Sequence, residues 1–97
     1  MSRPGEERRL TLMEVSLAYD GMDEPWQKTY FMHSPTIAIK INGTATVRIM
    51  GKVKGVESPV LPDISKSTIV KVDMILEEMK PIITSWSSGD VGVYLIG

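Results

Sequence analysis

Apolar residues recur at every second position in the segment TIAIKINGTATVRIMGKVKG, residues 36–55, and this alternation constrains the fold more than any other feature. Successive side chains of a β-strand point to opposite faces, so a period of two predicts strands with one buried face. The alternating apolar residues are Ile37, Ile39, Ile41, Val47 and Ile49. Asn42-Gly43 separates the two runs and is typical of hairpin turns. We therefore predict a hairpin here.

The hydrophobic pattern also predicts the register of this hairpin. A two-residue Asn-Gly loop would place Ile39 opposite Thr46 and divide the apolar side chains between the two faces. A three-residue loop over residues 42–44 instead places Ile39 opposite Val47 and keeps the apolar residues of both strands on one face. We expect this second register.

Five further segments have the alternation or the β-branched composition of strands. They cover residues 10–19, 28–34, 67–76, 81–86 and 90–96. In the first segment the phase of the alternation slips near Met13-Glu14, as a β-bulge would require. Turn residues separate the segments, among them Asp20-Gly21 and the Ser-Ser-Gly-Asp sequence of residues 87–90.

Helix content is expected to be low. Residues 74–80 could form one helical turn, but Pro81 would end it, and an extended or 3₁₀ conformation fits equally. Seven or eight short strands separated by turn residues predict an all-β fold, which we expect to be an antiparallel β-sandwich of jelly-roll type. This domain would cover residues 10–97. Residues 1–9 are charged, contain Pro4-Gly5 and lack an apolar face, so they predict a flexible N-terminal arm.

Composition argues against several classes of protein. The chain has 97 residues and no cysteine, which excludes disulfides and thiolate metal sites and favours a reducing compartment. Lys and Arg number 11 against 12 Asp and Glu, so no basic excess is available to neutralise a phosphate backbone, and we expect no nucleic-acid partner. No apolar run approaches the roughly 20 residues that span a bilayer, so we expect no membrane insertion and no secretion signal.

Candidate catalytic groups are few. His33 is the only histidine, so zinc sites and nucleophile–histidine pairs have at most one member. The acidic turn DGMDE, residues 20–24, is either a solvated turn or a set of oxygen ligands for calcium. Glu77 and Glu78 are adjacent and would point to opposite faces of an extended chain, unlike the carboxylate pair of a glycosidase. We expect no enzymatic activity, no cofactor and no metal.

Four aromatic residues are candidate binding groups: Trp26, Tyr30, Trp86 and Tyr94. They could form a stacking platform for sugar rings, as in small β-sandwich lectins. Alternatively, they could cover the core or lie in a subunit interface, because amphipathic rings suit both positions. An exposed row of aromatic rings would favour sugar binding, and rings buried between subunits would favour assembly.

Two segments resemble small β-sandwich proteins from the virions of tailed bacteriophages. MKPIITSWSSGDVGVYLIG, residues 79–97, resembles their closing hairpin, and NGTATVRIMGKVKGV, residues 42–56, is similar to the strand that precedes it. Together the segments cover about a third of the chain. The resemblance implies a non-enzymatic virion protein, such as a capsid decoration or cement protein, that is made in the host cytoplasm.

The same resemblance implies partners. A decoration protein would bind the major capsid protein as a homo-oligomer, for which a trimer is the expected state. The N-terminal arm could add contacts to the capsid through its charged residues, which are Arg3, Glu6, Glu7, Arg8 and Arg9. Two alternatives stay open: a carbohydrate- or receptor-binding module, such as a tail or fibre adaptor, and an unspecialised structural domain of a host protein.

Overall fold

The fold is all-β: a computed structural model describes residues 9–97, in which seven antiparallel strands form one sheet and no helix occurs. The strands are β1 (Arg9–Val15), β2 (Met22–Asp23), β3 (Gln27–Lys28), β4 (Thr36–Val53), β5 (Val56–Pro59), β6 (Thr68–Lys71) and β7 (Glu78–Ile96). The predicted all-β, antiparallel and helix-poor character is confirmed. The expectation of uniformly short strands is wrong, because β4 has 18 residues and β7 has 19.

Strands β4 and β7 pair along almost their entire length and form one long ribbon, from Thr36 opposite Ile96 to Lys52 opposite Glu78. The predicted hairpin over residues 42–44 is therefore wrong. Ile39 lies opposite Val93 in β7 and not opposite Val47. The alternation nevertheless predicted the correct buried face, since the apolar residues of both predicted runs are buried in β4.

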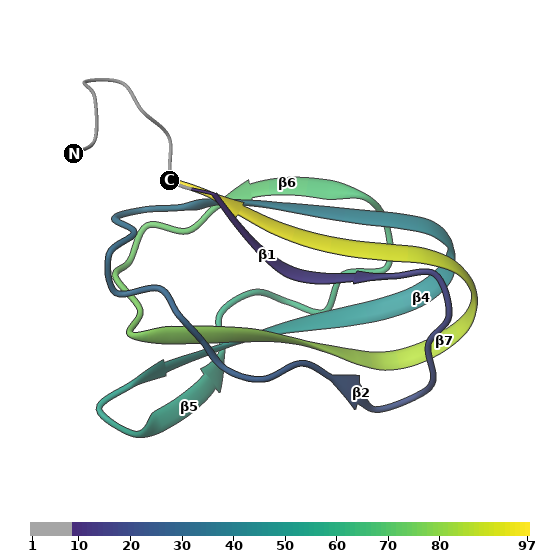
Figure 1. Cartoon of the computed structure of the whole chain (residues 1–97), viewed down its shortest axis with the longest axis horizontal. Coiled ribbons are helices and arrows are strands. Elements are labelled where there is room, and N and C mark those ends of the chain that lie inside the picture. The colour runs from purple at the N-terminus through teal and green to yellow at the C-terminus, as the bar shows by residue number, and fades with distance from the viewer. Residues whose placement is uncertain (1–8) are drawn as a thin grey trace.

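The ribbon curves back on itself at the right-hand side of Figure 1, at the level where Gly43 faces Gly89. A Cβ atom on Gly89 would collide with the carbonyl group of Asn42, and one on Gly43 would collide with that of Ser88. Gly89 also has a φ of 93°, in the region that favours glycine. Residues 42–44 and 87–90, each predicted to form a turn, thus belong to two paired strands, β4 and β7, that bend together.

Two β-bulges accompany the bend. The register of the ribbon shifts between Thr44 and Ala45 and again between Thr46 and Val47, each time because β7 contains an extra residue. A bulge bends and twists the strand that carries it. The extra residues lengthen β7 around the bend, while β4 keeps a strict alternation of buried odd-numbered residues on both sides.

The bend divides the ribbon into two halves with different flanking strands. We call residues 36–41 and 91–96 the Tyr94 half, and β1 and β6 flank it. Residues 45–52 and 78–86 form the Trp26 half, which β2, β3 and β5 flank. Buried residues of both halves form one hydrophobic core. The even-numbered residues Lys40 and Tyr94 lie on the outer face of the Tyr94 half.

Other predicted elements are partly confirmed. The bulge in the first strand lies between Thr11 and Met13, about where the phase slip predicted it, and both Leu12 and Met13 are buried. The predicted strand over residues 28–34 is wrong, since β3 ends at Lys28. The helical turn over residues 74–80 is absent, because Glu78 already begins β7.

Pro81 does not interrupt a strand but lies within β7, opposite Ile49. Its carbonyl oxygen accepts a hydrogen bond from the backbone N–H of Glu24 at 3.4 Å. Within residues 9–97, no helix could cross a membrane.

Candidate interaction surfaces

The four candidate aromatic residues are spread over the molecule and do not form one row. The ring of Trp26 lies against the Trp26 half, where the side chains of Lys52 and Lys80 contact it. Tyr94 is on the outer face of the Tyr94 half. Tyr30 is exposed in the segment after β3, where its ring meets that of Phe31 edge to face at 5.8 Å. Each of the four rings therefore has its own set of neighbours.

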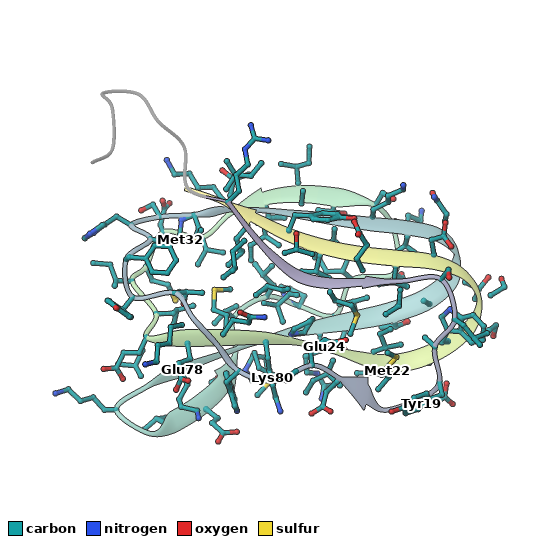
Figure 2. All side chains as sticks on the ribbon, in the orientation of Figure 1. Tyr19, Met22, Glu24, Met32, Glu78 and Lys80 are labelled. Carbon is teal, nitrogen blue, oxygen red and sulfur yellow. The ribbon has the colours of Figure 1, made fainter. Side chains whose placement is uncertain are left out.

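The ring of Trp26 is covered by charged groups of its own chain. The ammonium groups of Lys52 and Lys80 lie 4.4 Å and 5.1 Å from its centroid. Lys52 is also 3.5 Å from a carboxylate oxygen of Glu78, and Lys80 is 2.9 Å from one of Asp23. Figure 2 shows Glu78 and Lys80 along β7 in this part of the molecule. Cation–π contacts and ion pairs together hold this cluster, so the ring is engaged within the chain.

Trp86 takes part in the bend. Its indole N–H donates a hydrogen bond to the carbonyl oxygen of Gly89 at 2.9 Å, and its backbone N–H donates to Asp20 at 2.8 Å. The ring is partly buried and packs against the core. Trp86 and Asp20 thus fasten the bulged strand to the loop after β1, which is a structural role.

Tyr94 stands on the outer face of β7, over Gly92. A Cβ atom on Gly92 would lie 2.5 Å from the Tyr94 hydroxyl oxygen and under 3 Å from two ring carbons, so the ring covers bare backbone. The hydroxyl donates a hydrogen bond to Glu14 of β1 at 2.6 Å. This hydrogen bond is the main cause that raises the pKa of Tyr94, and burial and the charge of Glu14 add to it.

Hollows surround Tyr94 on three sides. One of about 290 Å³ contains Glu14, Lys40 and Asp90, and another of about 500 Å³ contains Ala38, Lys40 and Ile69. A third, of about 260 Å³, lies toward the beginning of β1. Tyr94 lines all three, and Lys40 lines the first two. The Tyr94 half therefore carries three open, shallow hollows beside one aromatic ring, and we call them together the concave surface around Tyr94.

The remaining predicted polar groups are dispersed. His33 is exposed in the segment before β4. Within the acidic turn, Asp20 accepts a hydrogen bond from the backbone N–H of Trp86, and Asp23 accepts one from the ammonium group of Lys80. Glu77 accepts a hydrogen bond from the backbone N–H of Lys54. Among residues 9–97, no three His, Cys, Asp or Glu side chains are grouped so that they could hold a metal ion.

An apolar groove at the far end of the Trp26 half was not found from the sequence. It measures about 320 Å³ and lies between β5 and the segment before β7. Val56, which is 69% exposed, and Met74, which is also exposed, line it, and Ile75 is exposed next to Met74 in the sequence. Met74 and Ile75 belong to the predicted strand over residues 67–76, in which alternation would bury one of the two. The sequence therefore does not predict this apolar groove.

The predicted arm is only partly within the described residues. Arg9 is the first residue of β1, where it lies opposite Ile96. Arg3, Glu6, Glu7 and Arg8 lie outside the described residues.

Comparison with known proteins gives one structural likeness. No protein-family model matches the chain, and no curated protein matches it in sequence. The fold is similar to that in the crystal structure of the SPBc2 prophage-derived protein YomS, with a TM-score of 0.62 and 15% sequence identity. The match covers 94% of this chain and 91% of that chain. The likeness in fold therefore extends over nearly the whole of both chains.

Proposed function

We propose that this chain is a non-enzymatic structural protein of a tailed-bacteriophage virion, and specifically a capsid decoration or cement protein. The observation that carries the proposal is the likeness to a prophage-derived protein over nearly the whole of both chains. The resemblance of residues 42–56 and 79–97 to virion β-sandwich proteins supports it independently, because it rests on sequence and not on fold.

The apolar groove supports assembly into a homo-oligomer, for which we propose a trimer. Val53, Val56 and Met74 expose apolar surface in this groove, next to β5, an edge strand whose four residues are all exposed. Exposed apolar surface at a free sheet edge is typical of a subunit contact. A second copy of the chain would bury this surface and satisfy the free backbone groups of β5.

The proposed partner on the virion is the major capsid protein. A folded-over sheet of jelly-roll type would present one outer face to the capsid, and residues 1–9 could add contacts from the beginning of β1. The alternative is a carbohydrate- or receptor-binding module, such as a tail or fibre adaptor, and the concave surface around Tyr94 is the feature that favours it.

The test is to locate the protein in particles. Virions released after induction of the encoding strain would be purified on a density gradient, separated into heads and tails, and analysed by mass spectrometry of tryptic peptides. We expect peptides of this chain in the head fraction, at a molar ratio to the major capsid protein that fits symmetric sites.

A lysate that contains the protein while the purified particles lack it would contradict the proposal. Peptides in tail fractions alone would favour the adaptor. As a matched control, heads from a deletion strain would be incubated with the purified chain and with a version lacking residues 1–8. Loss of binding on truncation would assign the capsid contact to the arm, and equal binding would assign it to the folded domain.

A further inference from the structure

We infer that the concave surface around Tyr94 is a binding site for a neutral saccharide, in which one pyranose ring stacks on Tyr94 and its hydroxyl groups are bound by Glu14, Asp90 and Lys40. The inference rests on the geometry of the Tyr94 half and does not depend on the proposed virion role.

The ring of Tyr94 is held in place before any ligand arrives. Gly92 leaves room for the ring to lie over the backbone, and the hydrogen bond to Glu14 holds its hydroxyl end. Two anchors restrict both torsions of the side chain. Binding therefore requires little additional ordering, which is the usual advantage of a preorganised aromatic group.

Polar side chains beside the ring are available to a ligand. Within residues 9–97, the side chains of Lys40 and Asp90 make no hydrogen bond or ion pair, although both line the hollow that contains Tyr94. Glu14 uses one carboxylate oxygen for Tyr94, and its second oxygen can still accept. The ammonium group of Lys40 and the carboxylate of Asp90 thus have no partner among the described residues beside the ring, and one oxygen of Glu14 can still accept a hydrogen bond.

A pyranose ring has an apolar face of C–H groups and a rim of hydroxyl groups, each of which donates and accepts hydrogen bonds. The Tyr94 ring suits the face, and Glu14, Asp90 and Lys40 suit the rim. The hollows of about 290 and 500 Å³ also have the size of small-molecule sites. Ala38 and Ile69 provide an apolar wall on the side of the larger hollow.

Charge narrows the class of ligand. Two carboxylates and one ammonium group line the hollow of about 290 Å³, so an acidic sugar in that hollow would be repelled and a neutral one would not. The same excess argues against a nucleotide, whose phosphates need basic groups. A proline-rich peptide could stack on Tyr94 but would leave Asp90 and Lys40 unused. Trp26 is not an equivalent site, because Lys52 and Lys80 already lie over its ring.

The experiment is an NMR titration of the full ¹⁵N-labelled chain with glucose, galactose, mannose and N-acetylglucosamine. Glucuronate is the acidic control, and a proline-rich peptide is the alternative stacking ligand. We expect at least one neutral sugar to bind with a dissociation constant on the order of 1 mM. The largest shift changes should fall on the amides of Lys40, Asp90, Gly92 and Tyr94, and glucuronate should bind at least about ten-fold more weakly.

Variants separate this site from other surfaces. Tyr94→Ala should weaken binding at least about ten-fold, and Asp90→Ala and Lys40→Ala, at exposed positions that should leave the fold intact, should each weaken it several-fold. Tyr30→Ala, which removes an exposed tyrosine elsewhere, should leave the affinity unchanged. The inference is overturned if none of the four sugars binds, if Asp90→Ala and Lys40→Ala bind as well as the unaltered chain, or if only glucuronate or the peptide shifts these amides.

Discussion

Trp26 and Tyr94 lie against the two halves of the same ribbon, yet their neighbours leave the two rings in different states. Lys52 and Lys80 lie over the ring of Trp26 and are themselves paired with carboxylates. Tyr94 lies over a glycine and donates a hydrogen bond to one carboxylate, and the side chains of Lys40 and Asp90 beside it make no hydrogen bond or ion pair within residues 9–97. The comparison teaches that an aromatic residue on a β-surface is available to a ligand only where the chain itself does not satisfy the ring and its surroundings.

The two halves of the ribbon also differ in where they expose apolar surface. The exposed apolar groove lies at the end of the Trp26 half, beside an edge strand. The Tyr94 half combines polar and apolar groups around one ring. We therefore expect the Trp26 half to serve assembly and the Tyr94 half to serve recognition.

The largest effect should come from a substitution in the bend that both halves share. Gly89→Ala would place a Cβ atom against the backbone of Asn42 at a positive φ, and should reduce the free energy of unfolding by more than about 3 kcal/mol. Gly55→Ala is the matched control, because Gly55 also has a positive φ but open space around it, and it should cost only about 1 kcal/mol. Chemical denaturation measures both, and equal losses would show that the contact between the strands is unimportant.

The next effect tests the division between assembly and recognition. Val56→Glu would bring a charge into the proposed subunit contact and should raise the dissociation constant of the oligomer at least about ten-fold. Leu17→Glu is the control, since Leu17 is at least as exposed but lies in the loop after β1. Sedimentation velocity measures the change. If the two variants dissociate equally, the groove is not the contact.

A smaller effect is expected for the ring of the Trp26 half. Trp26→Ala removes the contacts with Lys52 and Lys80, each worth about 0.5–1 kcal/mol, and should lower the free energy of unfolding by about 1–2 kcal/mol. Tyr30→Ala should change it by less than about 0.5 kcal/mol, because that side chain is exposed. Thermal or urea unfolding compares them. A loss for Trp26→Ala no larger than that for Tyr30→Ala would mean that the lysines do not hold the ring.

The smallest effect concerns the anchor of Tyr94. Its pKa is raised chiefly by the hydrogen bond to Glu14, so Glu14→Gln should lower the pKa of Tyr94 toward its ordinary value. Absorbance titration of the phenolate at alkaline pH measures this change, and Tyr94→Phe identifies the group. An unchanged titration curve in Glu14→Gln would show that the two side chains do not interact in solution.

The raised pKa of Tyr94 also makes one contribution to the pH dependence of the free energy of unfolding. The folded chain holds the Tyr94 proton more tightly than the unfolded chain does, so this contribution is complete below the unfolded-state pKa. It is lost as the pH rises through the folded-state pKa. The difference in the free energy of unfolding between the native chain and Tyr94→Phe should therefore change in that alkaline range.

Local pattern predicted the buried face of β4 and the bulge of β1, because both follow from which side chains can be buried. It could not predict that β4 continues through Asn42-Gly43. A glycine that closes a hairpin and a glycine that lets two adjacent strands bend together look alike in sequence. The distinction lies in Gly89, which faces Gly43 from the other strand, and that pairing is a long-range contact.

The candidate site was predicted only as a set of residue types. Tyr94 was named from its amphipathic ring, but its surroundings depend on β1 and β4, which bring Glu14 and Lys40 beside it. Trp26 looked equivalent in sequence and differs only because Lys52 and Lys80 lie over it. The apolar groove was missed for the same reason, since Val56 and Met74 meet through tertiary packing and not through a local pattern.

The pairing of β4 with β7 also determines the order in which the fold can form. The partners Lys52 and Glu78 are the nearest in sequence, whereas Thr36 and Ile96 are the farthest apart. Closing a shorter loop costs less entropy, so the ribbon should begin to pair in the Trp26 half and extend around the bend into the Tyr94 half. In stopped-flow kinetics, core substitutions at Ile49 should chiefly slow folding, whereas those at Ile37 should chiefly speed unfolding. The half that we assign to recognition would then be the last to close and the first to open.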